Sequence, residues 1–167
     1  MVDGCLHRVY LHSLGNKLMI NRVEKYIREP DDSEKLEIVI CLEAVLDTYY
    51  RALAELMPGE ANRRECQRLE SQVQDRQKEL RSSFVLSAEQ QMAIESKVYK
   101  YLLLLRPPDL FLRSVINTAI SLTAYKMDIY KNFSRIDHGH QELLNHYFED
   151  SVKEMNFLRK EMKLVSL

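Results

Sequence analysis

Turn-forming residues are scarce in this sequence of 167 residues, which contains only four glycines and four prolines. A β-sandwich needs many more of them, because each of its short strands ends in a tight turn. Glycine-rich phosphate loops and the glycine-flanked nucleophile elbow of hydrolases also find no match in the sequence. The scarcity favours an all-α chain and argues against these nucleotide-binding and hydrolase sites.

An excess of charge of one sign is lacking too, because 24 basic and 25 acidic side chains leave a formal net charge of -1. The chain as a whole has no attraction for phosphate backbones or anionic membranes, which disfavours nucleic acid as a partner. Cys5, Cys41 and Cys66 form no C-x-x-C pair, which favours reduced thiols. No apolar run has the length of a signal peptide or membrane span, so we predict a cytoplasmic protein.

What the sequence does contain is helical periodicity, most clearly between Asp109 and Lys131. Before Lys126, this stretch has only Arg113 as a formal charge, and its apolar residues cover nearly every direction around a helical turn. A helix that is apolar all round needs neighbours all round, so the stretch predicts a buried helix. Its polar residues are small and uncharged, and their hydroxyls can bond back to the backbone. They are Ser114, Asn117, Thr118 and Ser121.

Capping residues and helix breakers mark the other helices. Amphipathic patterns predict helices over residues 5–28, 33–57 and 60–82. A fourth helix should follow the capping box formed by Ser87 and Gln90. We expect Asp109 to cap the central helix and Ser134 or Asp137 to begin the last one. In the helix at 33–57 we expect a charged outer edge, made of Glu43, Asp47, Arg51 and Glu55.

These elements together predict an all-α fold. We expect one domain over residues 1–167, an antiparallel bundle of five to six helices around a central hydrophobic helix at about 109–131. Short loops between the helices favour the antiparallel order.

The helix at 60–82 differs from the others, because its apolar stripe is thin and has coiled-coil spacing. The stripe comprises Cys66, Leu69, Val73 and Leu80, with Arg76 at the missing position. Four apolar residues offset little of the entropy lost in ordering such a helix, so it should need a second surface. We therefore predict that these five residues bind a partner, either another protein or a second copy of the chain. On this hypothesis, Leu69→Glu or Val73→Glu disturbs association while the bundle stays folded.

His12 is the first candidate for chemistry, because Asn16 follows it four residues later and Leu18 six residues later. A helix-borne imidazole can attack a phosphoryl group, and a polar side chain one turn on can orient it. This run resembles the phosphoacceptor box of histidine-kinase dimerisation domains. The resemblance implies a histidine phosphotransfer module, although Ser13 stands where that family has an acidic residue.

Arg135 and His140, with four residues between them, are the second candidate. The spacing resembles the active-site motif of HEPN-type ribonucleases, which are small helical bundles. The resemblance implies that Arg135 would stabilise a phosphate and that His140 would help to move a proton. Ile136 replaces the polar residue that usually follows the arginine.

Acidic and histidine residues near the last helix are possible metal ligands. From His138 onward these residues recur every four positions and share one helical face, but no second ligand set exists on another predicted helix. They are Asp137, His138, Glu142, His146 and Asp150. We predict a solvated polar face there, with no metal and no cofactor.

Because no catalytic motif is complete in this sequence, the amphipathic helix surfaces are its main indication of function. We predict a non-catalytic protein–protein interaction module, meaning an adaptor, a regulator or a partner-binding subunit. The phosphotransfer and ribonuclease hypotheses remain the alternatives.

Overall fold

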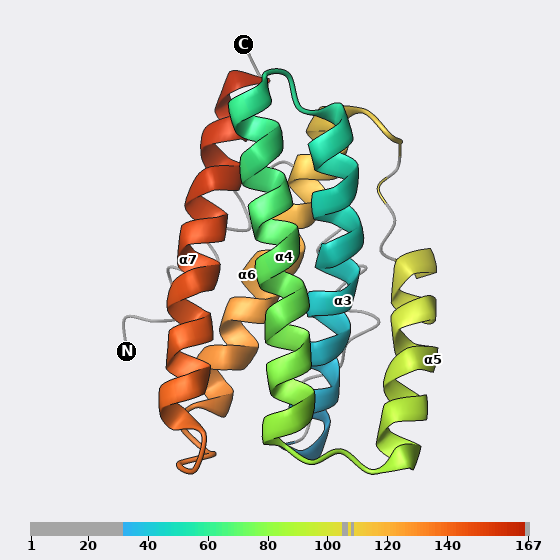
Figure 1. The fold of residues 1–167 in the computed structure, drawn as a ribbon, viewed down its shortest axis with the longest axis vertical. Helices are drawn as coiled ribbons and strands as arrows, with labels where there is room; N and C mark the ends of the chain where they lie inside the picture. The colour runs from blue at the N-terminus through green and yellow to red at the C-terminus, as the bar shows by residue number, and fades with distance from the viewer. Residues whose placement is uncertain (1–31, 105–106, 108, 166–167) are drawn as a thin grey trace.

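Five helices make up the part of the chain that the computed structural model describes, namely residues 32–104, 107 and 109–165. Successive helices run in opposite directions, and no strand occurs in these ranges (Figure 1). The helices are α3 (Asp32–Leu56), α4 (Glu60–Ser83), α5 (Ala88–Leu104), α6 (Leu112–Phe133) and α7 (Gln141–Leu164). The predicted all-α fold, a single domain of packed helices, is confirmed. The helix predicted at 5–28 lies outside the described residues.

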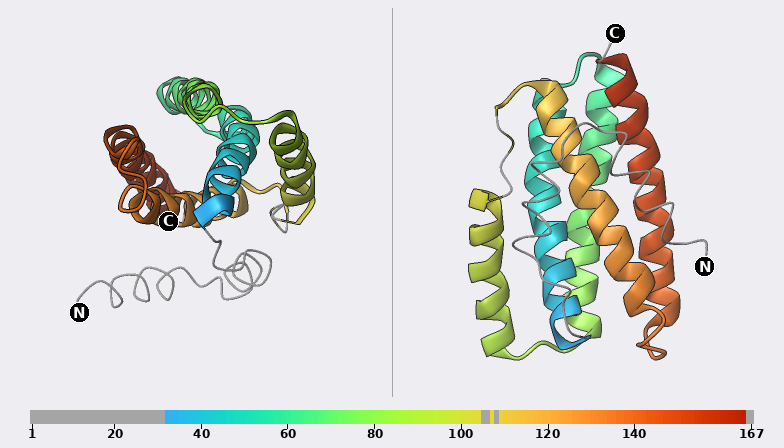
Figure 2. Two further views of the ribbon diagram at one scale, coloured as in Figure 1. Left: turned by 90° about the horizontal axis from the view of Figure 1, so that it is seen from below. Right: turned by 180° about the vertical axis from the view of Figure 1, so that it is seen from behind.

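Four of the helices form a bundle, and the fifth lies outside it. Around the bundle axis the order is α4, α3, α6 and α7, while α5 packs on the outer side of α3 (Figure 2). The buried helix predicted at about 109–131 is α6, which packs against α3 and α7. It shares the interior with α3, which packs against α4, α5 and α6. The apolar residues of α3 span most of its circumference, which allows it three neighbours.

Local hydrogen bonds explain where the helices begin. The Ser87 N–H donates to Gln90 Oε1 at 3.0 Å, and the Gln90 N–H donates to Ser87 Oγ at 3.2 Å. The predicted capping box of α5 is therefore confirmed. Gly59 precedes α4 with a φ of 82°, a left-handed conformation that glycine adopts without strain.

Two helix starts differ from the prediction. Phe111, in an extended conformation, precedes α6, and Asp109 Oδ1 accepts the Phe111 N–H at 3.0 Å without capping the helix itself. Asp137 Oδ1 accepts the N–H groups of Gly139 and His140 at 3.0 and 3.1 Å, which forms a turn before α7. Both aspartates use their side chains to fix a preceding turn, so α6 begins three residues after Asp109 and α7 begins four residues after Asp137. Ser134, the other predicted start of the last helix, caps the end of α6 instead.

The apolar stripe of α4 faces the interior of the bundle. Its apolar members are at most 1% exposed and Arg76 is 4% exposed, since α4 packs along α3. The members are Cys66, Leu69, Val73, Arg76 and Leu80. These side chains are covered by the chain's own helices, so they offer no free surface, and their role in binding a partner stays a prediction.

Buried positions on α6 and on α4 should respond alike to an introduced charge. Ile116→Asp and Leu69→Glu each place an unpaired carboxylate in the core, which costs several kcal/mol against a total stability of about 5–15 kcal/mol. We expect both variants to lose helical circular dichroism and cooperative melting. Asn156→Glu, at an exposed position on α7, is the matched control and should melt like the wild type. A folded Leu69→Glu variant would restore the earlier expectation for the α4 stripe.

Candidate functional site

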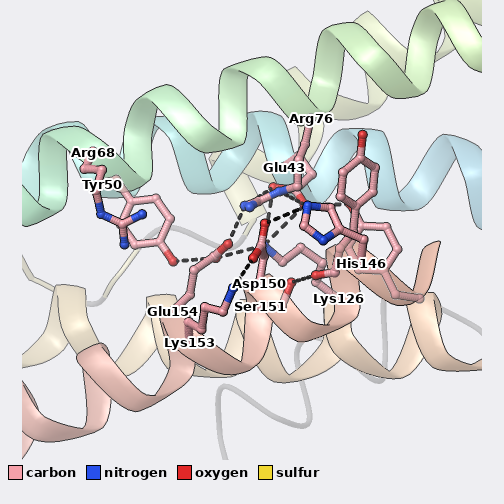
Figure 3. A network of polar contacts seen from close by, with 12 residues as sticks. Glu43, Tyr50, Arg68, Arg76, Lys126, His146, Asp150, Ser151, Lys153 and Glu154 are labelled. Carbon is pink, nitrogen blue, oxygen red and sulfur yellow. Dashed lines mark hydrogen bonds and ion pairs between the residues drawn. The ribbon is translucent and has the colours of Figure 1, made fainter. Parts of the chain in front are cut away.

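Each helix of the four-helix bundle contributes a charged side chain to one cluster in the interior. Glu43 comes from α3, Arg76 from α4, Lys126 from α6 and Glu154 from α7 (Figure 3). Their exposed fractions lie between 0 and 4%. The two carboxylates balance the two cations, so this buried charge network, as we call these four residues, has no formal net charge.

The Arg76 guanidinium bridges both carboxylates. Its Nε and Nη2 donate to the two oxygens of Glu43 at 3.0 and 3.1 Å, and Nη2 also donates to Glu154 Oε1. Lys126 Nζ also contacts both carboxylates, and it donates to Glu43 Oε2 at 3.3 Å and to Glu154 Oε2 at 2.9 Å. Each carboxylate therefore lies between two cations, which compensates the loss of its hydration.

Two buried tyrosines satisfy the remaining carboxylate lone pairs. Tyr50 donates its hydroxyl to Glu154 Oε2 at 2.9 Å, and Tyr130 donates to Glu43 Oε1 at 2.6 Å. Burial, reinforced by the adjacent carboxylates, raises the pKa of both phenols well above the ordinary value. Both tyrosines therefore remain protonated donors at neutral pH.

Glu43 and Arg76 keep their charges at neutral pH. Burial alone would raise the pKa of Glu43, but the charges of Lys126 and Arg76 outweigh it and hold this pKa below the ordinary value. Burial opposes the charge on Arg76 as well, but Glu43 and Glu154 outweigh it and raise the pKa of Arg76. Because all four residues are sealed from solvent, a substrate cannot reach them in this conformation. The network therefore serves the fold, and does not form an open catalytic site.

Long polar side chains also connect α4 and α7, on the side of the bundle where the neighbouring helices pack least closely. Beside the Arg76–Glu154 pair, Asn62 Nδ2 donates to Glu161 Oε2 at 2.8 Å. Toward the other end, Tyr147 donates its hydroxyl to Glu79. An ion pair and hydrogen bonds thus connect α4 and α7 at three levels along their length.

Of the residues in the two sequence resemblances, the structure describes only Arg135 and His140. His12 and Asn16 lie outside the described residues. His140 stacks on Phe84 with ring centroids 4.0 Å apart, and its Nδ1 lies 3.0 Å from Asp137 Oδ2. Arg135 is exposed, and the described residues show no hydrogen bond between its side chain and His140. The ribonuclease hypothesis stays a prediction, and the contacts of His140 are those of a packed loop residue.

His146 and Asp150, two of the residues considered as metal ligands, lie on α7 in a small group of surface charges. Asp150 lies 3.6 Å from His146 Nε2 and 2.8 Å from Lys153 Nζ. Within residues 32–104, 107 and 109–165, no group of three or more His, Cys, Asp or Glu side chains is placed to hold a metal ion. The five helices there include none with enough length and apolar character to cross a bilayer.

An exposed apolar surface lies on α5. This helix packs on α3 through one face, where Ile94 and Tyr101 are buried. The opposite face carries Met92, Tyr99 and Leu103, with exposed fractions of 70, 68 and 56%. Ser96 is exposed between them. We call Met92, Ser96, Tyr99 and Leu103 the outer face of α5.

Neither the network nor the outer face of α5 was predicted from the sequence. Glu43 was expected on a charged edge, and this is wrong, because its side chain is fully buried while Asp47 and Arg51 pair at the surface. One signal was available: Glu43, Arg76 and Lys126 each interrupt an apolar pattern. For α5 the signal was a helix with apolar residues on two opposite faces, more than one neighbour can cover.

Comparison of the chain with protein families, with curated proteins and with solved structures finds no match.

The network predicts strong coupling between Lys126 and Glu154. Lys126→Met or Glu154→Gln alone leaves an unbalanced buried charge, and each should lower the free energy of unfolding by about 3–5 kcal/mol. The double variant removes one charge of each sign and keeps the Glu43–Arg76 pair, so its loss should be clearly less than the sum of the single losses. Urea denaturation of all four proteins measures this coupling, and additive losses would show that the pair is not coupled.

The lowered pKa of Glu43 predicts loss of stability in acid. Its folded-state pKa lies below the ordinary value of 4.5, so the unfolded chain binds more protons and stability falls as the pH drops through and below that value. We expect urea midpoints to decrease from about pH 6 to about pH 3. Glu43→Gln should show a shallower decrease, because this carboxylate no longer titrates. Equal slopes for both proteins would mean that other groups cause the acid sensitivity.

Proposed function

We propose that the chain is a non-catalytic protein-interaction module whose binding surface is the outer face of α5. The observation that carries the proposal is the exposure of three large apolar side chains, Met92, Tyr99 and Leu103, along one side of one helix. Single exposed apolar residues are common, but an aligned group of them is typical of a surface that another protein covers.

The position of α5 supports the same role. It lies outside the four-helix bundle, and its inner face on α3 is enough to hold it in place (Figure 2). Tyrosine and methionine are enriched where proteins bind one another, since they supply large contact areas. The apolar stripe of α4, in contrast, is already covered by α3, so it is the less suitable binding surface.

Site-specific photocross-linking at Tyr99 tests the proposal. A benzoylphenylalanine at this position should leave the fold intact, because the side chain is exposed. When cells of the source organism that produce this variant are irradiated, the chain should become covalently linked to its partner protein. The same photoreactive residue at Asn156, an exposed position on α7, is the matched control and should give none.

Met92→Glu introduced beside the photoreactive residue should decrease the adduct about tenfold, since losing one buried apolar contact removes about 1.5 kcal/mol of binding. Equal labelling from Tyr99 and Asn156 would contradict the proposed function.

A further inference from the structure

The outer face of α5 has the spacing of a coiled-coil seam. Its residues, Met92, Ser96, Tyr99 and Leu103, follow one another at intervals of four, three and four. In the heptad notation abcdefg, Met92 and Tyr99 then occupy d positions, and Ser96 and Leu103 occupy a positions. A seam with this period fits lengthwise against another helix with the same period.

The charges beside the seam indicate which helix that is. In this register Glu95 is a g position and Lys100 is the following e position. Both are exposed, and the described residues contain no ion-pair partner for either. In two parallel helices a g residue faces the e residue five positions later on the partner helix. Glu95 of one copy would therefore face Lys100 of a second copy, and the two-fold symmetry repeats the pair.

An antiparallel arrangement lacks this complementarity, because g positions then face g positions and e positions face e positions. Glu95 would then face Glu95 of the second copy, and Lys100 would face Lys100. The charge pattern of α5 therefore favours a parallel pair of identical helices.

We propose that the outer face of α5 binds the same face of a second copy of this chain, with the two α5 helices parallel around a two-fold axis. The proposal rests on the proposed function and names its partner. The outlying position of α5 allows this arrangement, because α3 and the rest of the bundle lie on the opposite side of the helix (Figures 1 and 2). Such a two-fold contact closes on itself and gives a dimer.

The dimer should be reversible. A seam that extends from Met92 to Leu103 is short and has three large apolar side chains, so we expect it to bury less than the roughly 1,200 Å² that stable complexes bury. Ser96 contributes little apolar contact at the centre of the seam, although a small polar residue at an a position helps to fix the register. We therefore expect a monomer–dimer equilibrium that depends on protein concentration.

Disulfide trapping tests the orientation of the helices. In the full chain with Cys5→Ser, the additional change Ser96→Cys places two thiols opposite each other across a parallel seam, within bonding distance. Mild oxidation should give a covalent dimer. Gln91→Cys, exposed on the same helix but outside the seam, is the matched control and should give little dimer. Antiparallel helices would place residue 96 opposite residue 99, so preferential cross-linking between Ser96→Cys chains and Tyr99→Cys chains would overturn the parallel arrangement.

Charge exchange tests the partner by sedimentation velocity over a series of protein concentrations. Glu95→Lys and Lys100→Glu should each weaken dimerisation about fivefold, because each replaces two attractive pairs with two repulsive ones. The double variant restores opposite charges and should return to within about twofold of the wild type. A double variant that is as weak as the single variants would overturn the pairing.

The two proposals fail in different ways. A protein that stays monomeric at every concentration and forms no Ser96→Cys dimer overturns the second copy as partner. If the Tyr99 photoadduct then contains a different protein, the interaction function still stands. If no photoadduct forms either, the interaction function fails as well.

Discussion

Alternating charges at the centre of the bundle hold the structure in one arrangement. Arg76 and Lys126 each contact both Glu43 and Glu154, and the four residues come from four different helices. A shift of any one helix by a single residue would turn its charge by about 100° and leave the others unpaired in the core. Well-packed apolar residues could stabilise such a bundle as well. The particular contribution of the network is therefore to exclude other helix orders and registers.

The end of the bundle where α5 begins is fixed by a second set of contacts. Phe84 stacks on Phe133 and on His140, which connects the α4–α5 junction to α6 and to the loop before α7. Val85 follows with a φ of 45°, a left-handed conformation that is strained for a β-branched residue, and its side chain is exposed. The direction in which α5 leaves the bundle is therefore set, and a surface that is already ordered loses less entropy when it binds.

Helical periodicity was sufficient to predict most of the fold, because apolar spacing and caps such as Ser87 with Gln90 are local signals. The network was not predictable in the same way. The charged partners of Glu43 are Arg76 and Lys126, which lie 33 and 83 residues later in the sequence. When these partners are not known, the position of Glu43 four residues before Asp47 is equally consistent with a solvent-exposed charged edge. The exposure of Tyr99 depends in turn on where α5 packs, since the sequence of α5 alone does not reveal which apolar face meets α3.

α5 is also part of the connection between two helices of the bundle, α4 and α6. α4 ends and α6 begins at opposite ends of the bundle, so the chain must return along the bundle between them, and α5 covers the first part of that distance (Figure 1). Its 17 residues span about 25 Å as a helix. Natural selection can therefore change the outward side chains of α5 with little effect on folding, whereas its length is constrained. Related chains could keep the same bundle and differ in what this one connecting helix recognises.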